Sequence, residues 1–276
     1  MDEGPRDGQV IVCLHGEPTW GYLYRNFIPA LARHYRVIVP DHMGFGKSET
    51  PPDRVYTLQS HVENLTALIF ELDLNDVTFV CQDWGRPITG AFTIRHPERV
   101  KRLVLMNTLF GYSGVTVNPA PSAWFQWIAR HYEAGTLDGI LGELGSTILS
   151  VKKIIGFENS GAVDQTWIDA YSAPFQDRAS CIGAIEFPLD VHLGRFREYI
   201  VAGLETGNLD QLKAKPAMLA YGMKDRAIRP ENAIADFSSL FPDAPLNTFE
   251  DASHFCQEDS PDEIGQAVAE WRRGIA

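Results

Sequence analysis

The hydrophobic positions of this chain fall into short continuous runs, separated by stretches in which apolar residues recur at helical spacing. The runs predict six strands: Gln9–Leu14, Tyr35–Pro40, Val77–Gln82, Arg102–Met106, Ala217–Tyr221 and Leu246–Phe249. The helical patterns lie at Tyr22–Arg33, Leu58–Leu72 and Pro261–Arg273. Strands that are apolar along their length and alternate with helices are typical of a parallel sheet that is buried on both faces.

The alternation stops after Asn107 and resumes near Ala217. The residues between these points include Trp, Tyr, Gly and helix-like segments, but no clear run of Val and Ile. We therefore predict an α/β fold whose core spans residues 1–110 and 213–276. Residues 111–212 are predicted to form a helical cap over the functional site.

Length and composition favour one large α/β unit with a packed core. The chain has 276 residues, of which 45% are hydrophobic and 22% are charged, and this composition argues against disorder. Its net charge of −12 comes without any run of Lys and Arg, which argues against nucleic acid or an anionic membrane as a partner.

The cysteines and the first residues of the chain indicate in which cellular compartment we expect the protein. Cys13, Cys81, Cys181 and Cys256 lie far apart and match no zinc or CxxC spacing, so we expect free thiols in a reducing environment and no metal site. The start of the chain, MDEGPRDGQ, is too polar for a secretion signal, and no apolar run has the length of a membrane span. We expect a soluble, cytoplasmic protein.

One apolar run leads directly into candidate chemistry. Residues 77–85 read VTFVCQDWG: a strand, a short turn that holds Asp83, and a helix-like stretch that begins at Gly85. This pattern is typical of a nucleophile elbow, in which many chains carry serine where this one has Asp83. A carboxylate is already ionised and attacks to give a covalent ester. Because the indole N–H of the adjacent Trp84 can only donate, the pair favours a leaving group that departs as an anion.

Two later strands are each followed by a residue that completes a triad. Asp225 comes after the strand Ala217–Tyr221, and His254 comes after Leu246–Phe249. The order nucleophile, acid, base is that of the α/β-hydrolase layout, with His254 as general base and Asp225 orienting its ring. Each residue alone would be an ordinary loop residue; their order and their position at strand ends together predict the triad.

The turn after the first strand reads HGEPTW, from His15 to Trp20. The backbone N–H groups of Glu17 and Trp84 are predicted to form an oxyanion hole. We interpret His15 as structural. The Glu17 carboxyl is either a solvated loop acid or part of a polar pocket, and its expected closeness to Asp83 favours the pocket.

Several motifs together resemble the haloalkane dehalogenases of the α/β-hydrolase superfamily, and they span nearly the whole chain: HGEPTWGYLYRNFIP, PDHMGFGKSE, QDWG, GMKD and SHFCQED. The resemblance implies a mostly parallel sheet with a helical cap inserted after the sixth family strand, and no metal or organic cofactor. Asp83 would displace halide from an sp³ carbon of a small halogenated aliphatic substrate. His254 would then activate the water that hydrolyses the ester, which releases an alcohol and a halide ion.

The resemblance also implies two N–H donors that bind the departing halide. Trp84 matches the first. Members of the family with Glu at the position of Glu17 take the second donor from a tryptophan of the cap. Trp124 best matches that position, while Trp127, one helical turn further on, and Trp167 are the alternatives.

Two features depart from the family pattern. The family has residues, including a strand pair, ahead of the segment matched by Asp2-Glu3-Gly4, so either the edge of the sheet is missing or the true start lies upstream. A shortened sheet would expose an unpaired edge that favours self-association or low stability. A monomer and a homodimer both remain open. Arg86 stands where a small or apolar residue is commoner, and a cation in that place is expected to act on Asp83 or to narrow the pocket.

Two other functions use the same residues. An epoxide hydrolase shares the aspartate nucleophile but needs an acid for the ring oxygen, for which the cap offers Tyr112, Tyr132, Tyr171 and Tyr199. The HGEPTW motif and Trp84 argue against it, because an indole cannot usefully protonate an alkoxide. A non-catalytic protein that binds small molecules is the second alternative.

Overall fold

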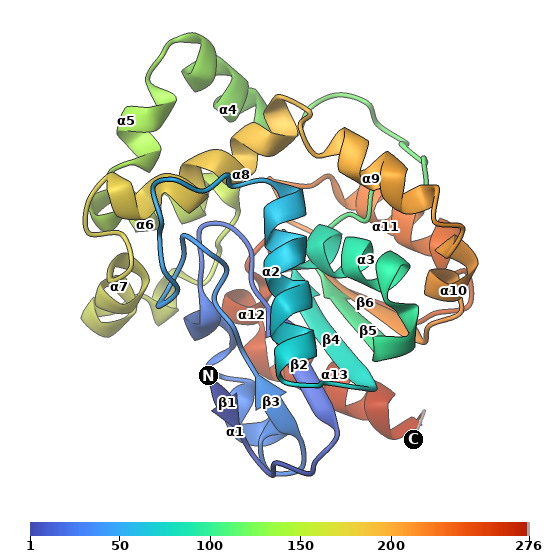
Figure 1. Cartoon of the computed structure of the whole chain (residues 1–276). Helices are drawn as coiled ribbons and strands as arrows, with labels where there is room; N and C mark the ends of the chain where they lie inside the picture. The colour runs from blue at the N-terminus through green and yellow to red at the C-terminus, as the bar shows by residue number, and fades with distance from the viewer. Residues whose placement is uncertain (275–276) are drawn as a thin grey trace.

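A seven-stranded sheet forms the centre of the computed structural model, which describes the backbone of residues 1–274 and the side chains of residues 1–271 (Figure 1). The strands are β1 (Asp2–Glu3), β2 (Val10–Leu14), β3 (Arg36–Ile38), β4 (Val77–Gln82), β5 (Val100–Met106), β6 (Ala217–Gly222) and β7 (Leu246–Phe249). Their order is β1-β3-β2-β4-β5-β6-β7, and only β1 pairs antiparallel with its neighbour. The predicted α/β fold with a mostly parallel sheet is confirmed.

The six predicted strands are all present, with ends that differ by at most two residues. The central strands β4 and β6 are buried along their whole length, which is why apolar residues predominate in them without alternation. The predicted helix over Tyr22–Arg33 is wrong. The structure has a 3-10 helix η1 (Gly21–Tyr24) followed by the short helix α1 (Ile28–Leu31). Pro29 explains the division, because it lacks an N–H and is tolerated only in the first turn of a helix.

Among the described strands, β1 rather than β3 forms one edge of the sheet, and β1 pairs on one side only. Asp2 and Glu3 pair with Ile38 and Val37, and the amino group of Met1 donates to the carbonyl of Val39 at 3.0 Å. The outer edge of β3 is therefore covered by residues at the start of this chain.

Helices flank the sheet on both faces. Figure 1 shows α2 and α3 in front of the sheet and α13 behind it. The flanking helices are α2 (Leu58–Glu71), α3 (Gly85–Arg95), α11 (Pro230–Leu240), α12 (Cys256–Asp259) and α13 (Pro261–Gly274), with a 3-10 turn η2 (Pro97–Arg99) ahead of β5. The predicted helices Leu58–Leu72 and Pro261–Arg273 are confirmed within one residue.

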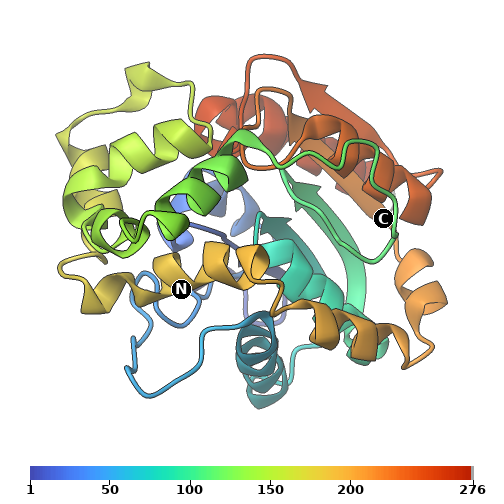
Figure 2. The same cartoon turned by 90° about the horizontal axis from the view of Figure 1, so that it is seen from above.

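The segment between β5 and β6 is helical, as predicted. It contains α4 (Ala123–Glu133), α5 (Leu137–Leu141), α6 (Leu144–Ile155), η3 (Ser160–Ala162), α7 (Gln165–Ser172), η4 (Ala179–Cys181), α8 (Ile182–His192), α9 (Arg197–Leu204) and α10 (Leu209–Lys213). Figure 2 shows helices of this insertion lying over the sheet. The helices α9 and α10 instead pack against α3. The division into a core and a cap of residues 111–212 stays a prediction.

Candidate active site

Asp83 lies in a sharp turn between β4 and α3, with a backbone φ of +50°. Such a φ is uncommon for a residue other than glycine, and strain of this kind concentrates at functional sites. Two glycines make room for the turn. A Cβ at Gly85 would lie 2.3 Å from the carbonyl oxygen of Leu14, and one at Gly16 would lie 2.3 Å from Oδ1 of Asp83. The turn therefore presents the Asp83 carboxylate at the end of the sheet.

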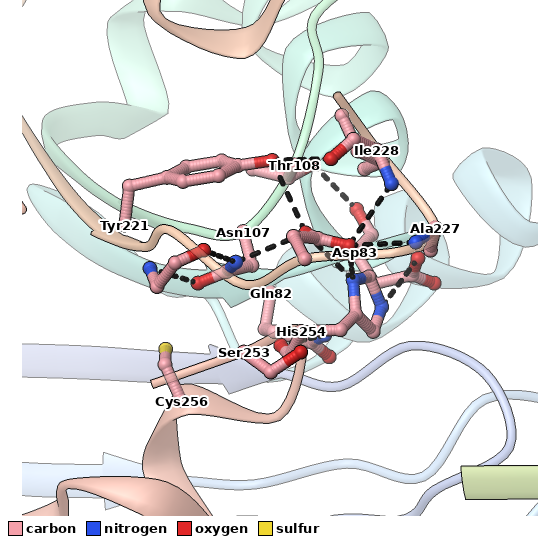
Figure 3. Close-up of polar contacts among 12 residues, drawn as sticks. Gln82, Asp83, Asn107, Thr108, Tyr221, Ala227, Ile228, Ser253, His254 and Cys256 are labelled. Atoms are coloured by element: carbon pink, nitrogen blue, oxygen red, sulfur yellow. Dashed lines mark hydrogen bonds and ion pairs between the residues drawn. The ribbon is translucent and has the colours of Figure 1, made fainter. Parts of the chain in front are cut away.

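The structure brings the three predicted triad residues together. Nε2 of His254 lies 3.1 Å from Oδ2 of Asp83, and Nδ1 of the same ring lies 3.0 Å from Oδ2 of Asp225. Figure 3 shows the His254 ring beside Asp83. Gln82, the residue before the nucleophile, donates from its side chain to the His254 carbonyl at 3.1 Å. Gln82 thus connects the loop that carries the base to the residue next to the nucleophile.

Asp225 is supported by residues that the sequence reasoning missed. Asn107 donates to its Oδ2 at 2.9 Å, and the Tyr221 hydroxyl lies 3.1 Å from the same atom. The backbone N–H groups of Ala227 and Ile228 donate to Oδ1 at 2.8 and 2.9 Å (Figure 3). Donors around a carboxylate stabilise its charged form. The position of Asn107 at the end of β5 could have identified it, because the ends of strands supply active groups in such sheets.

His254 is fully buried between these carboxyl groups. Burial alone lowers the pKa of an imidazole, but the negative charges and hydrogen bonds of Asp225 and Asp83 raise the pKa of His254 to about 10. The ring is therefore protonated at neutral pH.

Glu17 lies next to the nucleophile. Its backbone N–H donates to Oδ1 of Asp83 at 3.0 Å, which places one of the two predicted oxyanion donors within reach. Its side chain is 4% exposed and lines the cavity, so the expectation of a pocket residue, rather than a solvated loop acid, is met. Burial, together with the charge of Asp83, raises the pKa of Glu17 well above its usual value. Burial and the neighbouring negative charge therefore both favour the protonated form of this carboxyl.

A cavity of about 210 Å³ adjoins Asp83 and His254. Most of its wall is apolar and comes from both the sheet loops and the insertion, including Leu58, Pro87, Phe110, Phe125, Pro188 and Val191. A volume below the ~300–1,000 Å³ of drug-sized pockets favours a small ligand. The apolar wall favours an apolar one.

Trp84 and Trp124 both line this cavity. Trp84 belongs to the predicted core and Trp124 to the predicted cap. Trp127 stacks on Trp124 with ring centroids 5.1 Å apart but does not line the cavity. Trp167 is excluded by its own contacts, since its indole N–H donates to Glu258 at 3.3 Å. Of the three tryptophans in the insertion, Trp124 is the one that lines the cavity together with Trp84.

The four cap tyrosines do not supply an acid to the cavity. None of Tyr112, Tyr132, Tyr171 and Tyr199 lines it. The Tyr171 hydroxyl, for example, donates to Glu258. The tyrosine-based route to epoxide opening is therefore not present in this structure.

Arg86 does not narrow the cavity, contrary to expectation. Its buried guanidinium lies 3.3 Å from Asp236 and donates to the carbonyl of Thr108 at 3.2 Å, while the Phe110 ring lies 3.5 Å from its carbon Cζ. Burial lowers the pKa of Arg86 to about 10, and Asp236 opposes that shift. The cation serves to join α3 to α11 and the loop after β5.

Within residues 1–274, no group of three or more His, Cys, Asp or Glu side chains is arranged to hold a metal ion. No helix in the same range is long and apolar enough to cross a membrane.

The sequence and the structure of this chain are similar to those of known proteins. Residues 9–261 match the alpha/beta hydrolase fold family. Haloalkane dehalogenase 2 of Mycobacterium tuberculosis is 32% identical, covering 98% of this chain and 89% of its own length. The cis-3-alkyl-4-alkyloxetan-2-one decarboxylase of Xanthomonas campestris is also 32% identical, covering 97% and 89%. The tetrameric structure of haloalkane dehalogenase DpaA from Paraglaciecola agarilytica matches with a TM-score of 0.79 and 29% identity, covering 98% and 86%.

Proposed function

The chain belongs to the alpha/beta hydrolase fold family, with haloalkane dehalogenases among its relatives, and we propose that it hydrolyses haloalkanes to alcohols. The observation that carries the proposal is the Asp83 carboxylate, which faces a small apolar cavity lined by two tryptophans. An ionised nucleophile, anion donors and an apolar wall together suit an uncharged alkyl halide.

In the first step, one carboxylate oxygen of Asp83 attacks the carbon that bears the halogen. The C–O bond forms as the carbon–halogen bond breaks, and the halide leaves as an anion. The indole N–H groups of Trp84 and Trp124 bind that anion inside the cavity. Losing one such preorganised donor raises a barrier by about 3 kcal/mol.

The second step begins with a change in the charge around His254. Ester formation removes the negative charge of Asp83, which is one of the two carboxylates that raise the pKa of His254. The pKa of the ring then falls, so the imidazole can lose its proton and act as a base. It accepts a proton from the water that attacks the ester carbonyl, and Asp225 stabilises the imidazolium that forms. The acyl C–O bond then breaks, the alcohol leaves, Asp83 returns as a carboxylate, and one proton is released. The backbone N–H groups of Glu17 and Trp84 stabilise the oxyanion.

The size of the cavity sets the substrate class. At about 210 Å³ it suits short haloalkanes rather than long or branched ones. The partners of the protein are then a small halogenated aliphatic compound, water and the halide product.

The test is bromide release from 1-bromobutane and 1,2-dibromoethane by purified protein. Steady release that is lost in Asp83→Ala would support the proposal. In His254→Phe, the first turnover should leave an alkyl ester on the protein, seen by intact mass as the added alkyl group. Steady turnover by His254→Phe would contradict the assignment of the base, and a folded wild-type protein that releases no bromide would contradict the function.

A second candidate is favoured by the 32% identity to the oxetanone decarboxylase. Decarboxylation of a cis-3,4-dialkyloxetan-2-one gives an alkene and CO₂ and consumes no water. Incubation with such a lactone, followed by gas chromatography, separates the two candidates. Alkene without bromide release would replace the first proposal by the second.

A further inference from the structure

The Glu17 carboxyl is placed to hold a proton for which dehalogenation has no use. Its Oε1 atom is buried and has no hydrogen-bond partner among the described residues. Buried carboxylates are ordinarily paired with cations or N–H donors, so an unpaired one is held in its neutral form. Glu17 and Asp83 line the same cavity, and a 3.0 Å hydrogen bond joins the Glu17 backbone to the Asp83 side chain. A carboxylic acid thus stands beside a carboxylate nucleophile.

A halide and a ring oxygen differ in whether they need a proton as they leave. A halide is stable as a free anion, and the indole donors of Trp84 and Trp124 suffice for it. The oxygen of a strained ring becomes a strongly basic alkoxide when its C–O bond breaks, so it needs a proton at that moment. Indoles cannot supply it usefully, and the cap tyrosines do not line the cavity. The His254 imidazolium also lines the cavity, but its two nitrogens face Asp83 and Asp225, which leaves Glu17 as the acid for the ring oxygen.

We infer that Glu17 is a general acid that extends this active site to short aliphatic epoxides. The inference rests on the proposed function only for the role of Asp83 as nucleophile. Asp83 attacks a ring carbon, the C–O bond of the ring breaks, and the Glu17 proton passes to the ring oxygen. The product is a hydroxyalkyl ester of Asp83 and an ionised Glu17.

The second half-reaction hydrolyses the ester and returns Asp83 and Glu17 to their starting forms. His254 takes a proton from water as the water oxygen attacks the ester carbonyl of Asp83. The tetrahedral intermediate expels the diol oxygen, which receives that proton from His254. Asp83 is left as a carboxylic acid, and its proton passes to the Glu17 carboxylate. The sum is epoxide plus water giving a vicinal diol.

The experiment compares 1,2-epoxybutane with 1-bromobutane on the same protein. Diol formation is followed by gas chromatography and bromide release by ion chromatography. We expect wild-type protein to form the diol, and Glu17→Gln to lower the ratio of diol formation to bromide release by at least ~100-fold, the usual contribution of a general acid. Glu98→Gln is the matched control, because this side chain is 63% exposed and far along the sequence, and it should keep the wild-type ratio.

Several outcomes would overturn the inference. Steady bromide release by the wild-type protein without any diol would overturn it alone, as would a Glu17→Gln protein that keeps its ratio. Diol without bromide would support it and contradict dehalogenation, and neither product would contradict both. If Glu17→Gln fails to fold, quenched-flow measurement of ester formation by the wild-type protein decides. Ring opening should be slower in D₂O, whereas bromide displacement should not, and equal solvent isotope effects would overturn the inference.

Discussion

Replacing Asp225 by Asn tests whether this residue works through its charge or only through its shape. The hydrogen-bonding neighbours described for Asp225 include Asn107 Nδ2 at 2.9 Å, the N–H groups of Ala227 and Ile228 at 2.8 and 2.9 Å, and His254 Nδ1 at 3.0 Å. All of these are donors to a carboxylate. An asparagine must turn its own NH₂ group toward some of them, which leaves buried donors unpaired.

The structure sets the size of two effects of Asp225→Asn. An unpaired buried donor costs about 1–3 kcal/mol, so the free energy of unfolding should fall by about 2–4 kcal/mol. The charge that stabilises the imidazolium is lost as well, so hydrolysis of the ester should slow by ~10²–10⁴-fold. Because Asp83 attacks the substrate without a base, the ester should form and then accumulate.

The assay for Asp225→Asn is intact mass after rapid quenching with 1-bromobutane, together with urea denaturation. Asp251→Asn is the control, since that side chain is 95% exposed on the loop ahead of His254, and it should change unfolding by no more than about 0.5 kcal/mol. An Asp225→Asn protein that hydrolyses its ester at the wild-type rate would refute the role assigned to Asp225. Slow turnover without accumulated ester would show instead that the first step depends on it.

Three further predictions concern the halide donor and pH. Trp124→Phe should lower kcat/KM for bromide release by ~10²–10³-fold and Trp127→Phe far less; the reverse order in steady-state kinetics would move the donor to Trp127. Burial lowers the pKa of Lys152 to about 7. The free-energy penalty for burying its charge is therefore present below pH 7, and it is relieved as the pH rises toward the pKa that Lys152 has in the unfolded chain. The gain in unfolding free energy from Lys152→Met should therefore be largest near pH 6 and shrink toward pH 10; a pH-independent gain in urea titrations would contradict this. Because the pKa of His254 is raised to about 10, its stabilisation is full below about pH 6.5 and is lost as the pH rises through 10, so the wild-type protein should lose more stability than His254→Phe between pH 7 and 10.

The sequence was most informative where one local pattern determines structure. The run at Val77–Gln82 predicted a strand to the residue, because a strand buried in a parallel sheet needs a largely apolar sequence. The strand Leu246–Phe249 was also predicted to the residue, although it is only partly buried. The helix predicted over Tyr22–Arg33 was wrong because periodicity outweighed Pro29 in that interpretation. The placement of Asp83, Asp225 and His254 followed from strand ends, which meet at one edge of the sheet.

The parts that the sequence could not supply depend on contacts between distant segments. Asn107 and Asp225 are 118 residues apart, and nothing local to either residue indicates their hydrogen bond. Arg86 looked like a cation directed at the nucleophile, yet its partner is Asp236 on α11. In each case the side chain was visible in the sequence, while its direction was set by packing.

The carboxyl groups of this site show how neighbours, rather than burial, decide its chemistry. Asp225 and Glu17 are both at most 8% exposed. Asp225 is surrounded by N–H and O–H donors and faces the imidazolium of His254, and these contacts stabilise a negative charge. Glu17 has a buried oxygen without a partner and a negative neighbour in Asp83, and these conditions favour the proton. One fold thus surrounds Asp225 with donors and leaves Glu17 with a buried oxygen that has no partner, and the proposals for halide and oxygen leaving groups rest on this difference.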